Sequence, residues 1–365
     1  MGRGDFMETI DLSVLVAVYN AEKYLEQCLD SLIDQSVVRM EIIIVNDRST
    51  DRSNQILKKY EKSFKYIKII NKKKNEGTLL TRLDGMFQAV GRYVAFIDGD
   101  DTYQPQSLHN VLGVALEKKV DILEFEYRMI DTENKDVSNS SMGQNIVSDN
   151  TLIEGKKQCF DLLDRLEVPL FKRLYSKRLC RKVIDYFMHF IDYRDRFQGM
   201  LNEDEFLTPL FFSNARSYCC IGQKVYNYRF LRYGSITHKI STNCERKVRA
   251  GEEYMYICMN LSDEFERKGL INKKEYFKYN IKGIQFFLYK CVEGNVAIFH
   301  RMKMVNKYYS LWKIMYIYCG KWIFELMFPK GIRKGRRILP YERKIRNHWN
   351  CGHCISALFT GINDR

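Results

Sequence analysis

Short apolar runs alternate with segments of helical periodicity through the first hundred residues. The runs cover residues 12–18, 41–45, 66–70 and 93–97, and each has the length of a strand. Continuous apolar runs of this length are typical of strands that are buried on both faces of a sheet. Between the runs, apolar side chains recur every three or four residues, which predicts helices that bury one face. Strands and helices in alternation favour right-handed crossovers, so we expect a parallel α/β sheet.

Polar segments directly follow three of the predicted strands. They are Tyr19 with Asn20, residues 46–51 and residues 98–101. Ligands of open α/β sheets bind beyond the carboxyl ends of the strands, so we expect the functional site at this edge. Asn20 is also the predicted N-cap of the first helix.

The segment 98–101 places three carboxylates, Asp98, Asp100 and Asp101, in a window of four residues. Like charges this close repel one another unless a cation offsets them. Hard carboxylate oxygens favour Mg²⁺ or Mn²⁺, and such a site leaves ligand positions for the phosphate oxygens of a substrate. A polar loop with a helix N-cap is the alternative interpretation, because aspartate is favoured in both places.

Residues 46–51 also allow two interpretations. Asp47 stands at the end of its strand, where its carboxylate can accept hydrogen bonds from the imide of a pyrimidine base. Alternatively, Ser49 or Asp51 caps the helix that runs through Ile56 and Leu57.

The segment Asn202-Glu203-Asp204-Glu205 is a third candidate for the site. Acids in the first turn of a helix complement its dipole and need no chemistry. In the functional alternative, one of these carboxylates is a general base.

Positive charge is concentrated near the end of the 365-residue chain. Residues 301–350 carry 13 Lys and Arg against two acids and supply most of the net charge of +14. No apolar run there reaches the roughly 18 residues of a membrane-spanning helix. Aromatic and basic residues together favour an interfacial helix on an anionic membrane surface. A packed helical subdomain with a basic surface is the alternative.

The length and the apolar content of 45% allow one large domain with an appendage, or two domains. We place the boundary near residue 240, between a domain over residues 1–240 and a helical, aromatic and basic region over residues 241–365. Eleven scattered cysteines, with no signal-peptide-like segment before them, favour a cytoplasmic protein, with a position on the inner face of the plasma membrane if the basic region binds lipid. Residues 128–200 match no pattern that we can interpret.

Taken together in this order and spacing, the candidate segments resemble the family 2 glycosyltransferases of the GT-A fold. The resemblance covers about residues 10–240 and implies a Rossmann-like, mostly parallel sheet flanked by helices, with a C-terminal helical, basic extension. The matching segments are residues 14–20 and 24–32 (opening strand and helix), 41–51 (second strand and nucleotide-base loop), 75–77 with Arg82, 91–101 (metal motif), 203–206 (acid pair), and Tyr228-Arg229 with 234–237 (the segment that commonly follows).

The resemblance implies a nucleotide-diphosphate sugar donor, with uracil as the base. Asp47 would bind the base with Tyr19 near it, and Arg82 would lie close to the base or the pyrophosphate. Asp98 would lie by the ribose or the metal. Asp100 and Asp101 would lie at the metal, Mn²⁺ or Mg²⁺.

The resemblance also implies a reaction. Asp204 would take a proton from an acceptor hydroxyl that attacks the anomeric carbon, and this single displacement inverts the anomeric configuration. The acceptor would be a glycan or a lipid-linked molecule of cell-surface polysaccharide synthesis, and no nucleic acid is expected as a partner. The competing interpretation is a catalytically silent protein whose basic tail binds membrane or nucleic acid. Intact acids in all three segments argue against it.

The sequence departs from the family pattern at two positions. The family usually has proline where this chain has Ala17, and glycine where it has Arg48. Glycine tolerates positive φ and close backbone approach. Arg48 therefore predicts either a different turn or a side chain that lies over the nucleotide.

Overall fold

The computed structural model of the chain describes residues 10–35, 39–138, 149–230 and 243–293. The chain divides into two compact units, Met1–Ser235 and Ile236–Arg365. The predicted boundary near residue 240 and the basic region 301–350 lie outside the described residues.

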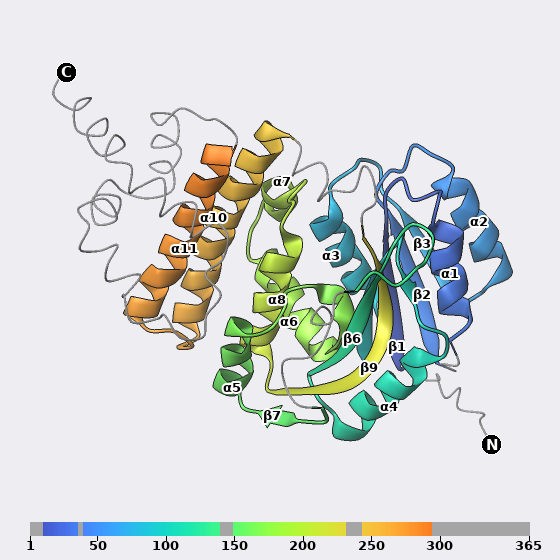
Figure 1. Cartoon of the computed structure of the whole chain (residues 1–365), viewed down its shortest axis with the longest axis horizontal. Helices are drawn as coiled ribbons and strands as arrows, with labels where there is room; N and C mark the ends of the chain where they lie inside the picture. The colour runs from blue at the N-terminus through green and yellow to red at the C-terminus, as the bar shows by residue number, and fades with distance from the viewer. Residues whose placement is uncertain (1–9, 36–38, 139–148, 231–242, 294–365) are drawn as a thin grey trace. The chain divides into compact units, whose positions relative to one another are not determined.

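One sheet forms the centre of the first unit, with the strand order β3-β2-β1-β4-β8-β6-β9-β5 and β7 paired to β9 (Figure 1). The predicted strands at its start are confirmed: β1 to β4 pair with one another in parallel. The strands are β1 (Leu12–Val18), β2 (Met40–Asn46), β3 (Ile67–Asn71), β4 (Tyr93–Asp98), β5 (Thr102–Tyr103), β6 (Ile122–Ile130), β7 (Leu152–Glu154), β8 (Arg173–Ser176) and β9 (Ser217–Arg229).

The other half of the sheet makes it mixed, where a mostly parallel sheet was predicted. β8 pairs antiparallel with both β4 and β6, whereas β9 pairs parallel with β6 and antiparallel with β5 and β7. β8 is only four residues long and begins with an arginine, so it carries no apolar run that would reveal a buried strand. β6 therefore has an antiparallel partner, β8, on one side and a parallel partner, β9, on the other.

The pairing of β6 with β9 contains a bulge. Between Phe125 and Tyr127, β6 advances by two residues, while β9 advances from Ile221 to Tyr226 and so carries three extra residues. A bulge of this kind changes which side chains face the core. Cys219 and Ile221 before the bulge, and Tyr226 after it, belong to the same buried cluster.

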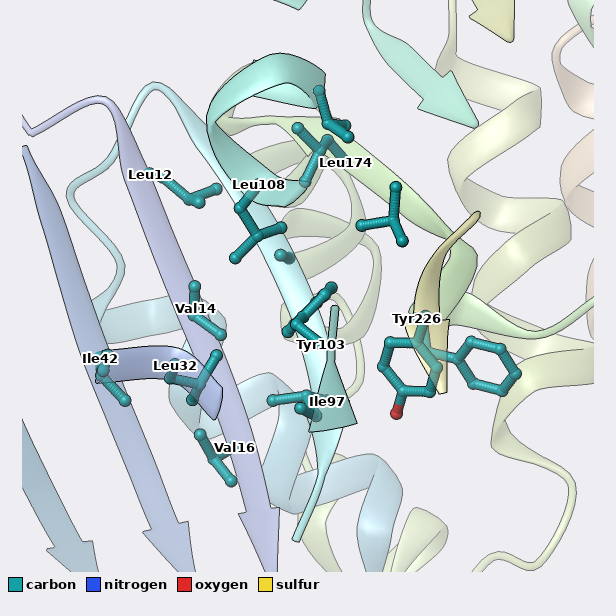
Figure 2. Packing of buried hydrophobic residues seen from close by; sticks show 14 of the residues in the cluster. Leu12, Val14, Val16, Leu32, Ile42, Ile97, Tyr103, Leu108, Leu174 and Tyr226 are labelled. Atoms are coloured by element: carbon teal, nitrogen blue, oxygen red, sulfur yellow. The ribbon is translucent and has the colours of Figure 1, made fainter. Parts of the chain in front are cut away.

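Helices cover both faces of the parallel strands. On one face, Leu12, Val14 and Val16 of β1 pack in a cluster with Leu32 of α1 and Leu108 of α4 (Figure 2). On the other face α3 lies so close that a Cβ at Gly85 would be 3.3 Å from Leu15. The helices of this unit are α1 (Leu25–Ile33), α2 (Ser53–Ser63), α3 (Thr78–Gln88), α4 (Ser107–Lys118), α5 (Lys156–Asp161), η1 (Leu162–Asp164), η2 (Leu170–Lys172), α6 (Lys177–Met188), α7 (Tyr193–Phe197) and α8 (Glu203–Asn214).

The described part of the second unit is a pair of packed helices, α10 (Cys244–Arg267) and α11 (Lys273–Glu293). Glycines let their backbones approach, since a Cβ at Gly283 would lie 3.0 Å from the Cα of Met255. The Nδ2 of Asn280 donates to the hydroxyl of Ser262 inside this contact at 2.9 Å. None of the described helices is long and apolar enough to span a membrane.

Candidate active site

The carboxyl ends of β1, β2 and β4 meet at one edge of the sheet, as the sequence predicted. Their register pairs Val18 with Asn46 and Ala17 with Asp98. The segments that follow β2 (residues 46–51, the β2 loop) and β4 (residues 98–101, the acidic loop) therefore start at the same level of the sheet.

Side chains within the β2 loop and beside it hold its shape. The Oδ1 of Asn20 accepts a hydrogen bond from the backbone N–H of Thr50 at 2.8 Å, and the backbone N–H of Asn20 donates to Ser49. The prediction that Asn20 caps the first helix is therefore wrong: α1 begins at Leu25 with no side-chain cap, and Asn20 fixes the neighbouring loop instead. Asp51 accepts from the backbone N–H of Ser53, at the start of α2.

Asp47, within this loop, is buried. Its Oδ1 and Oδ2 accept hydrogen bonds from the backbone N–H groups of Glu76 and Gly77, each at 2.8 Å. The buried Nζ of Lys72 lies 3.1 Å from Oδ1. Asp47 thus ties the β2 loop to residues 72–77. Tyr19, in contrast, is 50% exposed at the end of β1.

Arg48 has φ of 64°, in the left-handed region that glycine adopts most readily. The backbone at Arg48 therefore has a conformation that suits glycine, and the arginine adopts it. This is not the different turn that was one of the two interpretations of the sequence. A non-glycine residue in this region is strained by roughly 1–2 kcal/mol.

Arg82, on α3, joins two of the predicted acidic segments. Its Nη2 donates to Asp98 at 3.0 Å, and its Nη1 donates to Asp204 at 2.6 Å. The same Nη1 lies 3.3 Å from the Oε1 of Glu203. The guanidinium is almost completely buried, whereas the side chain of Asp98 is 33% exposed and that of Asp204 is 29% exposed. The acidic loop and the acid pair, more than a hundred residues apart in sequence, therefore meet around one cation.

Burial raises the pKa of both members of the acid pair. The pKa of Glu203 rises to about 8, with the charge of Arg82 opposing the rise and those of Asp204 and Asp98 adding to it. The pKa of Asp204 is also raised, again by burial and against Arg82. Effective general bases have a pKa near the working pH, so these carboxyl groups are shifted in the direction that acid–base chemistry requires.

Asp101 is the buried aspartate of the acidic loop. Its carboxylate accepts hydrogen bonds at 2.7 Å from the hydroxyl of Tyr226 and the backbone N–H of Arg229. Burial, with the charges of Asp100 and Asp98, holds the pKa of Asp101 well above its usual range. These charges act on it because all three carboxylates lie close together.

Arg229 anchors the acidic loop, a role that the sequence did not reveal. Its buried guanidinium donates to the backbone carbonyls of Asp100 and Asp131 and stacks on the ring of Tyr24. Sequence reasoning singled out Arg229 only as part of a recurring segment, since an isolated arginine at a strand end carries no signal of burial. Within the described residues, no group of three or more His, Cys, Asp or Glu side chains is arranged to hold a metal ion.

Comparison with known proteins identifies the domain. The model of the family described as Glycosyl transferase family 2 matches residues 13–183, from β1 into α6. The chain contains a family 2 glycosyltransferase domain. The match includes the β2 loop, Arg82 and the acidic loop, and it ends before the acid pair at residues 203–204.

Curated bacterial relatives of this glycosyltransferase domain match over its first part. The uncharacterized glycosyltransferase YibD of Escherichia coli K12 is 38% identical over 114 residues, which are 31% of this chain and 33% of YibD. The putative glycosyltransferase EpsH of Bacillus subtilis 168 is 43% identical over 30% of this chain and 31% of its own. The putative teichuronic acid biosynthesis glycosyltransferase TuaG of B. subtilis 168 is 38% identical over 29% of this chain and 42% of its own. The chain thus spans less than half the length of these relatives.

Solved structures show that the fold extends further than these alignments. The crystal structure of S. aureus TarS 1-349 in complex with UDP-GlcNAc has a TM-score of 0.51 and 21% identity, over 77% of this chain and 81% of that chain. The structure of TarS 1-349 without a named ligand has a TM-score of 0.50 and 19% identity, over 77% of this chain and 80% of the other. At this identity the likeness shows a shared fold, the GT-A fold that the sequence predicted.

Proposed function

We propose that this chain is an inverting glycosyltransferase that transfers a sugar from a UDP-sugar to a hydroxyl group of a glycan or lipid-linked acceptor in cell-surface polysaccharide synthesis. The observation that carries the proposal is the bridge from Arg82 to Asp98 and Asp204. It joins the acidic loop of the family domain to a carboxylate suited to general-base work. The complex of TarS with UDP-GlcNAc supports the donor class, and the teichuronic acid biosynthesis for which TuaG is named supports the acceptor class.

In this proposal the base of the donor lies at the β2 loop. Tyr19 is exposed and offers its ring to the base. Asp47 already accepts two backbone N–H groups, so it fixes residues 76 and 77 and offers its remaining lone pairs to the imide of uracil. Arg82 is proposed to lie close to the pyrophosphate, behind Asp98, to which it donates a hydrogen bond.

Asp204 is proposed to be the general base. It takes the proton of the acceptor hydroxyl as the oxygen bonds to the anomeric carbon and the bond from that carbon to the diphosphate breaks. The hydrogen bond from Arg82 orients its carboxylate. The second carboxyl group, Glu203, lies against the same guanidinium, and burial raises its pKa to about 8.

A divalent cation, Mn²⁺ or Mg²⁺, fits the chemistry of the acidic loop. Burial raises the pKa of Asp101, and the charges of Asp100 and Asp98 add to the rise. Hard oxygens are the ligands that these ions prefer. Asp98 and Asp100 are both partly exposed and would hold the ion, with Asp101 behind them in its hydrogen bonds to Tyr226 and Arg229. When bound, the ion would offset negative charge on the departing diphosphate.

Release of UDP from a panel of UDP-sugars with Mn²⁺ tests the proposed activity. Wild-type protein should release UDP from at least one donor, and a panel without any turnover contradicts the proposal. Asp204→Asn should lower kcat by about 10²–10⁴-fold and leave the donor KM within a few-fold, because only the proton acceptor is lost. Equal turnover by this variant would remove Asp204 from the role of base.

The predicted membrane contact of residues 301–350 remains part of the proposal and rests on their sequence. Flotation with anionic vesicles tests it, with a variant that ends at residue 300 as the control. We expect the full chain to float and the shortened chain to stay in solution. Failure of the full chain to bind, or equal binding by both, contradicts a membrane role for this region.

A further inference from the structure

The segment of residues 193–200, which precedes the acid pair, packs on the loop of residues 72–77. The backbone N–H of Gly199 donates to the carbonyl of Glu76 at 2.7 Å. The contact leaves no room for side chains, because a Cβ at Gly77 would lie 2.9 Å from the Cα of Gly199. The side chain of Gln198 adds bonds to Lys74 and to the carbonyl of Asn75.

Arg194 holds this contact from the side of the segment. Its Nε and Nη2 donate to the two oxygens of Glu76 at 3.1 and 2.5 Å. Its Nη1 and Nη2 also donate to the two oxygens of Asp84, on α3, at 2.8 and 3.0 Å. The hydrogen bonds that Glu76 accepts from Arg194 and Lys72 lower its pKa to about 2. A guanidinium that bonds two carboxylates in this way fixes direction as well as distance.

Both ends of this contact lead to residues of the proposed reaction. In one direction, the backbone N–H of Glu76 donates to Asp47, and Lys72 pairs with both carboxylates. In the other direction, α8 begins at Glu203, four residues after Gly199, and carries Asp204 in its first turn. Arg194 thus lies on a short chain of contacts between the proposed base pocket and the proposed general base.

We propose that Arg194 is a positioning residue, which sets the acid pair relative to the nucleotide loop by clamping residues 193–200 on residues 72–77. The inference rests on the proposed function. Arg194 acts through Glu76 and Asp84 and needs no contact with the donor. Misplacement of a catalytic group by about 1 Å can lower a rate by roughly 10²-fold, so a loosened clamp should be visible in turnover.

Arg194→Lys tests the clamp because it keeps the positive charge and loses the planar guanidinium that bonds two carboxylates at once. Arg196→Lys is the matched control: it lies on the same helix, α7, and its ion pair with Asp192 is long, at 3.8 Å. We expect Arg194→Lys to lower kcat by at least about tenfold with the donor KM within about twofold, and the control to match wild type. An unchanged kcat, or a loss confined to KM, overturns the inference.

Hydrogen–deuterium exchange of the same three proteins without any donor gives a second measurement. Amides of residues 197–206 should exchange faster in Arg194→Lys and not in Arg196→Lys, and equal exchange overturns the clamp. If wild-type protein transfers no sugar, the proposed function fails, and the exchange result alone then decides the clamp. Asp84→Asn replaces one of the two carboxylates that Arg194 bonds, and it should give a smaller loss of kcat. This variant tests the clamp if Arg194→Lys does not fold.

Discussion

The β2 loop and the acidic loop both follow parallel strands and both carry aspartates, yet the protein uses these aspartates differently. In the β2 loop, Asp47 is buried and Asp51 accepts hydrogen bonds from the backbone, so both hold the local structure. In the acidic loop Asp101 does so, while Asp98 stays partly exposed and meets Arg82. Residue type and position at a strand end therefore do not separate a structural carboxylate from a chemical one. Asp47 and Asp101 accept backbone N–H groups, whereas Asp98 meets the guanidinium of Arg82.

The largest effect should come from the acidic loop. We expect Asp100→Ala to lower transfer by about 10³-fold or more, since the divalent ion that would offset charge on the leaving diphosphate loses a ligand. The midpoint of thermal unfolding should stay close to that of wild type, because Asp100 is partly exposed and the buried anchor of the loop is Asp101. Unchanged sugar transfer would discard the metal assignment and with it the contrast between the loops.

In the β2 loop, stability should respond more strongly than in the acidic loop. Asp47→Ala leaves two buried backbone N–H groups without their acceptor, which should lower the free energy of unfolding by about 1–3 kcal/mol. Urea denaturation measures this loss. Asp51→Ala is a useful companion variant in the same loop. If Asp47→Ala is as stable as wild type while turnover is lost, the aspartate of the β2 loop is chemical too, and the contrast between the loops fails.

A pH series extends the comparison to the acid pair. The pKa of Glu203 in the folded protein, about 8, lies above its ordinary value of 4.5. The folded state therefore binds more protons than the unfolded state between these values, and stability falls as pH rises through this window. Glu203→Gln should flatten that dependence, measured as the free energy of unfolding from pH 5 to pH 8 in the absence of divalent ions. An identical slope in both proteins would mean that Glu203 ionises normally.

The smallest effect should come from Arg48. Replacement by glycine relieves the left-handed backbone and adds freedom to the unfolded chain, so we expect Arg48→Gly to stabilise the protein by about 0.5–1 kcal/mol. Donor KM should be measured beside stability. A rise in KM would assign the arginine side chain to the nucleotide, as one of the two interpretations of the sequence held.

Local patterns predicted β1 to β4, and with them the edge where the loops gather. They also placed Asp98 and Asp204 among the chemical candidates, and the structure brings both to Arg82. They could not reveal Arg229 or Arg194, whose partners lie far away in sequence and whose charge alone suggests a solvated residue. Asn20 shows the same limit, because a cap and a loop contact place the same residue type at the same position.

The bulge between β6 and β9 has a consequence for how the chain tolerates insertions. Successive residues of a strand face opposite sides, and three extra residues, an odd number, exchange the two sides. Tyr226, whose hydroxyl donates to Asp101, lies two residues after residue 224. Loss or gain of one residue within 222–224 should therefore turn the tyrosine hydroxyl to the wrong side of the sheet, whereas a change of two residues preserves the parity.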